Sequence, residues 1–318
     1  MDQTAINSIV NSDTQIAILM CTYNGAAYLR EQLDSFARQS FTNWKLYISD
    51  DGSSDKTLEI LHEYQSEWGH NRIYIFNGPR MGFAKNFISL AKRLDIKADF
   101  YAFSDQDDIW HTNKLERSIE IIGNAPNNKP ALYCSRTTII DERGQKLGYS
   151  PLFSRPPSFK NALIQSLAGS NTMLINKRTK ELIELIKEDL PVVAHDWASY
   201  MLVTGCGGTA FYDENPTVDY RQHNANQIGA NSTLRARINR LKGMFSGRFK
   251  KWTDQNITLL SSLEKHLTTE NKTIIKKFEE LRLAPPLQQI ILLKKLGLYR
   301  QTTLGNVSLI VAILLKQI

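Results

Sequence analysis

The chain has 318 residues, enough for one large α/β domain with an appendage or for two modest domains. Its composition, 42% apolar and 22% charged, is that of a soluble globular protein, and its polar N-terminus lacks the basic start and apolar core of a secretory signal. Residues 233–318 hold 16 Lys and Arg against 5 Asp and Glu, a net charge of +11; because the whole chain carries +7, residues 1–232 carry −4. A basic region of this kind suits an anionic membrane, a nucleic acid or an acidic substrate.

Residues 16–110 alternate between strand and helix patterns. Apolar runs that begin at residues 16, 44, 71 and 100 predict strands, and apolar residues at helical spacing predict helices over 26–40, 57–69 and 83–94. This order predicts a mostly parallel sheet with helices on both faces, as in a Rossmann-like nucleotide-binding unit. Ligands of such sheets bind beyond the carboxyl ends of the strands.

The pattern changes after residue 110. Residues 131–147 predict two strands around a turn at Arg143-Gly144, and 166–176 and 211–221 predict further strands. Helices are expected over 178–188 and 192–205, and residues 233–318 read as basic amphipathic helices. The predicted domains are therefore a main domain over 14–232, with a nucleotide-binding half over 14–110 and an acceptor half over 111–232, and a helical C-terminal region over 233–318.

Two features concern the compartment. Cys21, Cys134 and Cys206 have no metal or disulfide spacing, so we expect packing residues in a reducing cytoplasm. The apolar stretch near the C-terminus is too short for a spanning helix, which needs about 20 residues. It is expected either to lie in a bilayer interface or to pack on the domain.

Three polar clusters fall where predicted strands end. They are Thr22-Tyr23-Asn24, Asp50-Asp51-Gly52-Ser53 and Asp105-Gln106-Asp107-Asp108. Two carboxylates in an Asp-x-Asp pattern can converge on Mg²⁺ or Mn²⁺, which take oxygen ligands and share them with phosphates. The alternative for this cluster is a solvated acidic turn. For the Asp50-Asp51 segment the alternative is a turn with a helix cap, and we expect one Asp to bind a base or ribose and the rest to cap.

Three further segments carry candidate residues. Asp196, at the start of a predicted helix, is either a general base or a helix cap, with His195 and Trp197 placed to orient it and exclude water. The loop YRQHNANQIG is either a diphosphate and metal site or a self-bonded polar loop. Its candidate ligands are Arg221, His223, Asn224 and Asn226. Lys85 lies either near the nucleotide or on an exposed helix face; no P-loop or GxGxxG motif is present.

The ordered series CTYNGAAYLREQLDSFARQSFTNWKLYISDDGSSDKT, SDQDDIW, HDW and YRQHNANQIG resembles glycosyltransferase family 2 over about residues 14–230. The resemblance implies the GT-A fold, a nucleotide-diphosphate sugar donor, Mg²⁺ or Mn²⁺ and inversion at the anomeric carbon. The SDQDDIW and HDW spellings are similar to those of bacterial rhamnosyltransferases and other O-antigen or capsule transferases. The implied donor is dTDP-rhamnose, with a UDP-hexose or UDP-HexNAc as the alternative.

The resemblance also implies roles for residues. Asp51 resembles the carboxylate that reads the base, with Thr22, Tyr23 and Asn24 nearby; Asp105 and Gln106 lie near the ribose. A second set serves the diphosphate and the reaction. In it, Asp107 is the metal ligand, His223 a late metal or diphosphate ligand, Asp196 the base, and Lys85, Arg221 and Asn226 further donor contacts. His195 stands where many members of the family have Glu, and Lys85 stands where many have Arg. Lysine keeps the positive charge of arginine but cannot form its bidentate hydrogen bonds.

The acceptor implied by the resemblance is a growing lipid-linked glycan at the inner face of the cytoplasmic membrane. Residues 233–318 would suit a peripheral contact with anionic lipid there. Three alternatives remain from other classes. A nucleotidyltransferase would need a glycine-rich triphosphate loop, which this sequence does not show. A non-catalytic nucleotide-sugar-binding protein would not need Asp107, Asp196 and His223 together. Nucleic-acid binding would need a reader motif, which this sequence also does not show.

Overall fold

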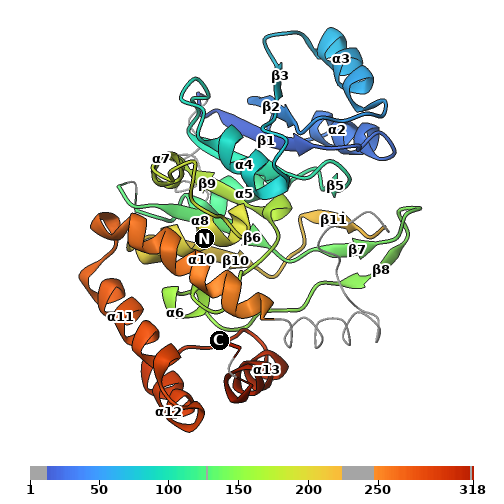
Figure 1. Cartoon of the computed structure of the whole chain (residues 1–318). Helices are drawn as coiled ribbons and strands as arrows, with labels where there is room; N and C mark the ends of the chain where they lie inside the picture. Colours follow the sequence, from blue (N-terminus) through green and yellow to red (C-terminus); the bar gives the residue numbers. More distant parts are fainter. Residues whose placement is uncertain (1–12, 127, 224–246, 316) are drawn as a thin grey trace.

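The structure is a computed structural model of the whole chain, and it describes residues 13–126, 128–223, 247–315 and 317–318. Its centre is a seven-stranded sheet in the order β10–β6–β9–β4–β1–β2–β3 (Figure 1). The strands are β1 (Ile16–Thr22), β2 (Trp44–Asp50), β3 (Ile73–Asn77), β4 (Phe100–Ser104), β6 (Ala131–Ser135), β9 (Leu174–Asn176) and β10 (Thr209–Asp213). Strands β1 to β4 pair in parallel, as do β6 and β10, whereas β9 is antiparallel to both β4 and β6. The predicted mostly parallel sheet is confirmed, with β9 as its exception.

Helices cover both faces of this sheet, because both faces of its strands are apolar. In β1, alternate residues enter opposite cores: Ala17, Leu19 and Cys21 on one side, and Ile16, Ile18 and Met20 on the other. The helices are α2 (Leu29–Ala37), α3 (Thr57–Trp68) and α5 (Lys114–Ile122) on the second side, and α4 (Phe83–Ala91), α6 (Phe159–Ala162), α7 (Lys177–Glu184) and α8 (His195–Gly205) on the first. The predicted helices in this part of the chain are confirmed, and α5 and α6 are additions.

A second, four-stranded sheet stands beside the first, in the order β5–β11–β7–β8. Its strands are β5 (Ile109–Trp110), β7 (Thr138–Ile140), β8 (Lys146–Tyr149) and β11 (Val218–Arg221). Strands β7 and β8 form the hairpin predicted around Arg143-Gly144, where Gly144 has a φ of +79°. Because β11 pairs with β5, the end of β11 lies next to the acidic segment that follows β4.

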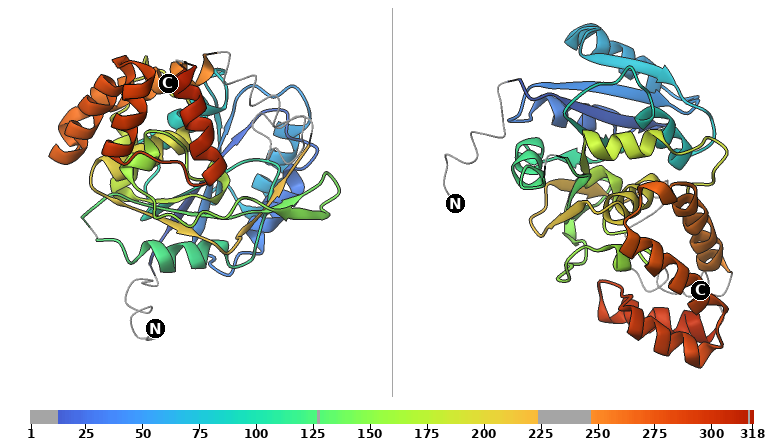
Figure 2. Two further views of the ribbon diagram at one scale, coloured as in Figure 1. Left: turned by 90° about the horizontal axis from the view of Figure 1, so that it is seen from below. Right: turned by 90° about the vertical axis from the view of Figure 1, so that its left-hand side faces the viewer.

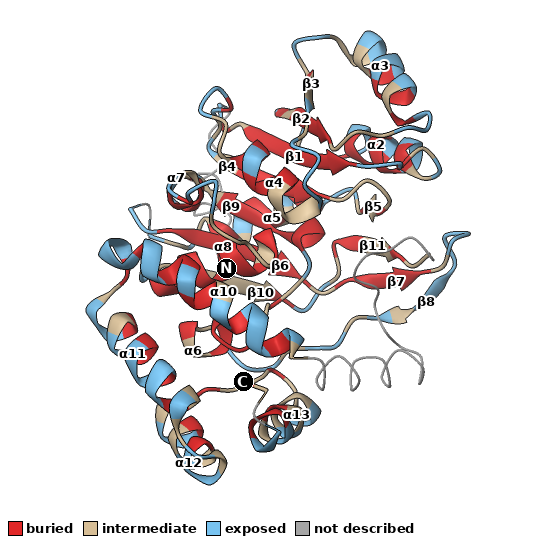
Figure 3. Cartoon of the chain, viewed as in Figure 1, coloured by how far each residue is buried: buried red, intermediate tan, exposed pale blue. Residues whose placement is uncertain are grey.

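The C-terminal region is helical, as predicted: α10 (Arg248–Ser262), α11 (Thr269–Leu283), α12 (Pro286–Leu296) and α13 (Thr303–Leu314). Leu260, Phe278 and Leu281 of these helices are fully buried in the same core as α8, so the region packs on the main domain (Figure 3). The boundary predicted at residue 232 lies outside the described residues, and the domain limits remain predictions. No helix in the described part of the chain has both the length and the apolarity to cross a bilayer.

Candidate active site

The predicted polar clusters meet at one edge of the large sheet. Thr22, at the end of β1, pairs in register with Asp50 at the end of β2, and β4 ends alongside at Ser104. The hydroxyl of Thr22 donates to Asp50 Oδ2 at 2.8 Å. The carboxyl ends of these parallel strands therefore place all three clusters side by side, where the fold class leads one to expect a ligand.

The loop after β1 is clamped to the loop after β4. The side-chain amide of Gln106 donates to the carbonyl of Tyr23 (3.0 Å) and accepts from its N–H (2.9 Å). A Cβ at Gly25 would lie 2.2 Å from Gln106 Oε1, so only glycine permits this approach. Asn24 bonds to the 53–54 segment instead, whereas the Tyr23 ring is 55% exposed and free to meet a ligand.

Asp50 and Asp51 have different environments. Asp50 is buried and accepts hydrogen bonds from the Gly52 and Ser53 N–H groups and from the Ser53 hydroxyl, so it is the residue that shapes the turn. Asp51 is partly exposed, and its two oxygens accept from the N–H groups of Arg80 (2.6 Å) and Gly82 (2.8 Å). Each oxygen keeps a lone pair for a ligand donor. Asp51 already orders the 80–82 loop, and its base-reading role stays a prediction.

The acidic cluster after β4 crowds three carboxyl groups. Burial and the charges of Asp107 and Asp196 raise the pKa of Asp105 to about 8. Asp108 is fully buried and structural: it accepts from the Asn171 amide (2.5 Å) and from the Arg221 N–H (3.1 Å), and burial raises its pKa. Protons or a cation must balance this negative charge.

Asp107 and His223 face one another at the rim of the cluster. Asp107 Oδ2 lies 2.7 Å from His223 Nε2, the two side chains are 15% and 11% exposed, and the His223 ring packs on Tyr28. Among the described residues no group of three or more His, Cys, Asp or Glu is gathered for a metal. One carboxylate and one imidazole nevertheless suit an ion that takes its remaining ligands from water and substrate phosphates. The residues present therefore fit Mg²⁺ or Mn²⁺ held in that way.

Arg221 and Lys85, which are predicted to contact the sugar donor, already have partners within the protein. Arg221 is 1% exposed, and its guanidinium bonds to Glu31, the Asp107 carbonyl and the Glu142 carbonyl. It ties β11 to the acidic cluster. The ammonium of Lys85 donates to the carbonyls of Glu188 and Leu190, at 2.5 and 2.7 Å.

These contacts give both cations a structural explanation. Their predicted contact with the donor remains a prediction, and Asn224 and Asn226 lie outside the described residues.

Asp196 opens α8 on the side of the acidic cluster. Its Oδ1 accepts from the Trp197 N–H at 2.7 Å, and burial raises its pKa to about 6. Its charge helps to raise the pKa of Asp105, and the ring of the preceding residue, His195, packs against Phe103 near the end of β4. A carboxyl group that is easily ionised at neutral pH but more basic than usual suits a general base.

His195 does not orient Asp196 by hydrogen bonding. The ring is 2% exposed, stacks on Phe87 with a centroid distance of 3.9 Å, and packs edge-on against Phe103. Neither ring nitrogen has a hydrogen-bond partner within the structure described, and burial lowers the pKa of His195 to about 3. His195 is thus a neutral packing residue that seats the first turn of α8, while the Trp197 indole N–H donates to the Ala162 carbonyl.

His195→Phe should remove a pH dependence of stability. The folded state keeps His195 neutral down to about pH 3, whereas the unfolded chain binds a proton near pH 6.5, so acid costs the wild type up to about 1.4 kcal/mol per pH unit in that window. Urea titrations at pH 7 and pH 5 should show a smaller loss for His195→Phe. An equal loss in both proteins would contradict the buried neutral imidazole.

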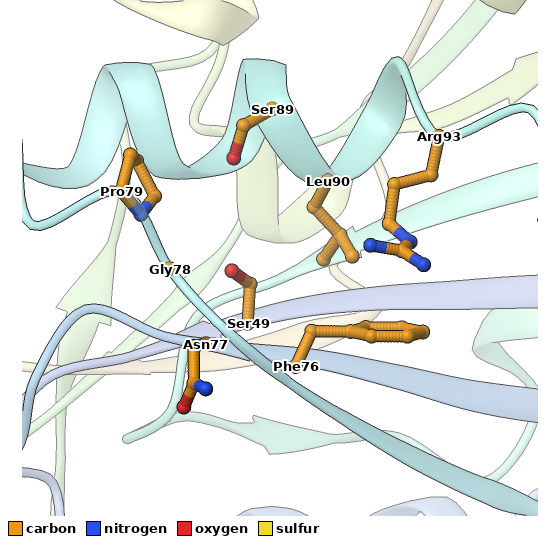
Figure 4. Close-up of a pocket in the computed structure, with 8 residues that line it drawn as sticks. All are labelled: Ser49, Phe76, Asn77, Gly78, Pro79, Ser89, Leu90 and Arg93. Atoms are coloured by element: carbon orange, nitrogen blue, oxygen red, sulfur yellow. The ribbon is translucent and has the colours of Figure 1, made fainter.

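A cavity of about 220 Å³ lies between α4 and the end of β3 (Figure 4). It is lined by Ser49, Phe76, Asn77, Gly78, Pro79, Ser89, Leu90 and Arg93. The Arg93 guanidinium stacks over the Phe76 ring at 3.7 Å. None of the predicted site residues lines this cavity, so it is separate from the acidic cluster.

Several residues that build the site carry no motif. Gln32 accepts from the Asp108 N–H, Asn171 donates to its carboxylate, and Glu31 pairs with Arg221. Lys114 lies beneath the cluster, fully buried over the Trp110 ring, and burial lowers its pKa to about 7. Gln32 and Lys114 give a sequence signal, because each is a polar residue on the apolar side of a helix.

Comparisons with known proteins identify the family of the chain. The sequence model described as glycosyl transferase family 2 matches residues 17–179, about half of the chain. A dTDP-rhamnosyl transferase of Shigella flexneri, RfbG, is 30% identical over 256 residues, which cover 76% of this chain and 83% of that protein. The chain belongs to glycosyltransferase family 2. This family 2 chain is therefore a glycosyltransferase, as the resemblance implied. The putative teichuronic acid biosynthesis glycosyltransferase TuaG of Bacillus subtilis is 24% identical, over 68% of this chain and 82% of that protein.

Solved structures show the fold of this family 2 enzyme. Residues 1–349 of S. aureus TarS, in complex with UDP-GlcNAc, match 96% of this chain and 89% of that one, with a TM-score of 0.54 and 14% identity. GalNAc-T7, solved with UDP, GalNAc and Mn²⁺, matches 72% of this chain and 48% of that one, with a TM-score of 0.51 and 13% identity. These neighbours are GT-A transferases, so the expected GT-A fold is confirmed.

Proposed function

We propose that this enzyme transfers rhamnose from dTDP-rhamnose to a hydroxyl group of a lipid-linked glycan, with inversion at the anomeric carbon, in the synthesis of a bacterial surface polysaccharide. One observation carries the reaction: α8, which bears the candidate base Asp196, packs its first residue, His195, against Phe103 of β4, next to the edge of the sheet where the strand-end clusters meet. The donor assignment is supported by the similarity to RfbG.

The side chains of the chain divide the work as follows. Asp51 and the exposed Tyr23 ring receive the nucleoside, and Asp105 and Gln106 lie where the ribose would follow. Asp196 takes the proton of the acceptor hydroxyl as that oxygen attacks the anomeric carbon from the face opposite the leaving diphosphate. A single displacement of this kind inverts the centre and needs no covalent intermediate.

Asp107 and His223 would hold Mg²⁺ or Mn²⁺. Such an ion neutralises charge on a leaving diphosphate when it is bound. The Arg221 network fixes the backbone of Asp107, and the packing of the His223 ring against Tyr28 fixes the imidazole, so protein contacts hold both side chains in position.

The acceptor is proposed to be bound at the inner face of the cytoplasmic membrane, with the enzyme as a cytoplasmic, peripheral partner of that surface. The chain's basic C-terminal region, residues 233–318, supports this placement, because each Lys or Arg near an anionic surface contributes roughly 1 kcal/mol.

A thermal-shift panel tests the donor. With Mn²⁺ present, dTDP-rhamnose should raise the melting temperature more than UDP-glucose, UDP-GlcNAc or GDP-mannose, because a ligand that binds only the folded state stabilises it in proportion to its affinity. A larger shift with a UDP-sugar would show that the donor is a UDP-sugar rather than dTDP-rhamnose, and the reaction would still be sugar transfer. No shift with any nucleotide sugar would contradict the proposed function.

A further inference from the structure

The exposed side of α13 is apolar, as the interior of a protein is. Apart from Thr303 at its first position, the exposed residues of this helix are all leucine or valine: Leu304, Val307, Val311 and Leu314. Their spacing of three, four and three places them along one stripe, opposite the buried Leu309 and Ile313. A surface helix in water normally shows polar residues on that side, and no residue that the structure describes covers this stripe.

The neighbouring helix α12 also exposes apolar side chains. Leu287 and Ile291, one turn apart, are 74% and 65% exposed, and Lys294 and Lys295 follow on the exposed side. The two helices contact one another, and they lie at the end of the molecule farthest from β3 (Figures 1 and 2). We call Leu287, Ile291, Leu304, Val307, Val311 and Leu314 the apolar face of α12–α13.

This surface is unusual within the protein. Of the sixteen exposed large apolar side chains in the described residues, eight lie between residues 283 and 315. The charge there has one sign, because no Asp or Glu follows Glu280 in the sequence while Lys294, Lys295 and Arg300 do. Contiguous exposed apolar surface in a soluble protein marks an interaction site.

We propose that the apolar face of α12–α13 seats on an anionic lipid bilayer, with its apolar side chains in the interface and Lys294 and Lys295 against the headgroups. The connection of this surface to a lipid-linked acceptor rests on the proposed function. The helices are too short to span a bilayer, so they lie in its surface. Mixed apolar and cationic side chains without acids match anionic lipid.

A second copy of the chain fits this surface less well. A two-fold interface would bring the same residues of both copies together. Lys294 and Lys295 of each copy would then approach their counterparts, and residues 281–318 supply no carboxylate side chain to pair with them. The bilayer is therefore the occupant that the charges favour.

Vesicle co-sedimentation of the full chain tests the proposal, with phosphatidylcholine vesicles that do or do not contain 30% phosphatidylglycerol. Leu287→Ser/Ile291→Ser and Val307→Ser/Val311→Ser should each lower the partition coefficient on the anionic vesicles at least about tenfold. Leu147→Ser/Leu185→Ser, at positions of similar exposure (60% and 45%) elsewhere on the molecule, is the matched control and should bind like the wild type. Lys294→Gln/Lys295→Gln should weaken binding to the anionic vesicles only.

Two outcomes would overturn the proposal: wild-type binding by both apolar variants, or a wild-type dimer in analytical ultracentrifugation that those variants dissociate. Melting temperatures with and without nucleotide sugar, measured without vesicles, separate this proposal from the proposed function. Vesicle binding without any effect of nucleotide sugar on the melting temperature would support the docking surface and contradict the proposed donor.

Discussion

Asp196→Asn is expected to lower the rate of sugar transfer by about 10²–10⁴-fold, which is the usual contribution of a positioned general base. The amide keeps the shape of the side chain and its Oδ1 can still accept from the Trp197 N–H, so α8 should start as before. The variant should therefore melt near the wild-type temperature and bind the donor with nearly unchanged affinity. Single-turnover transfer and donor titration, measured on the same preparation, check the two halves of this result.

The pH profile gives the base a second readout. Burial raises the pKa of Asp196 to about 6, and only the ionised carboxylate can accept the proton of the acceptor. Activity should therefore be full above pH 7 and fall about tenfold per pH unit below pH 6. The residual activity of Asp196→Asn should lack this limb. A variant that transfers sugar at the wild-type rate, or that keeps the same acid limb, would place the base elsewhere.

Much of the fold follows from local pattern. The first four strands and the helices between them are visible in sequence because each strand is a short apolar run and each helix shows one apolar side. The antiparallel insertion of β9 between β4 and β6 is different: its three residues, Leu174–Asn176, carry no sign of direction or neighbour. Pairing partners depend on long-range packing, which single segments do not encode.

The site shows the same division. Sequence places Asp105, Asp107 and Asp196 correctly at strand and helix ends, because motifs at element ends are local. It cannot show that Arg221 is buried among Glu31 and two backbone carbonyls, since those partners come from segments far apart in the chain. In the sequence of a polar loop, an arginine that is exposed cannot be distinguished from one that is buried and structural. Only the tertiary contacts distinguish them.

Asp107→Asn is the other substitution expected to have a large effect, on the dependence of donor binding on the cation. The Asp107 carboxylate, which lies beside His223, is the proposed oxygen ligand of Mn²⁺, and an amide is a much weaker ligand for a hard ion. In the wild type, Mn²⁺ should tighten donor binding at least about tenfold, whereas in the variant donor affinity with and without Mn²⁺ should be nearly equal. Isothermal titration with the nucleotide sugar, in Mn²⁺ and in EDTA, measures both.

The second sheet supplies a matched control for this experiment. His111 and Asp219 form another Asp–His pair, more exposed than the first, with Nε2 and Oδ1 2.8 Å apart. Asp219→Asn removes the same charge from an Asp–His pair that contains none of the predicted metal ligands, so its response to Mn²⁺ should stay that of the wild type. If Asp107→Asn also keeps the full Mn²⁺ effect, the cation is held by other groups, and the contact between Asp107 and His223 is a structural hydrogen bond like that of His111 and Asp219. Loss of the effect in both variants would instead trace it to the charge of the protein as a whole, because the two substitutions share only the removal of one carboxylate.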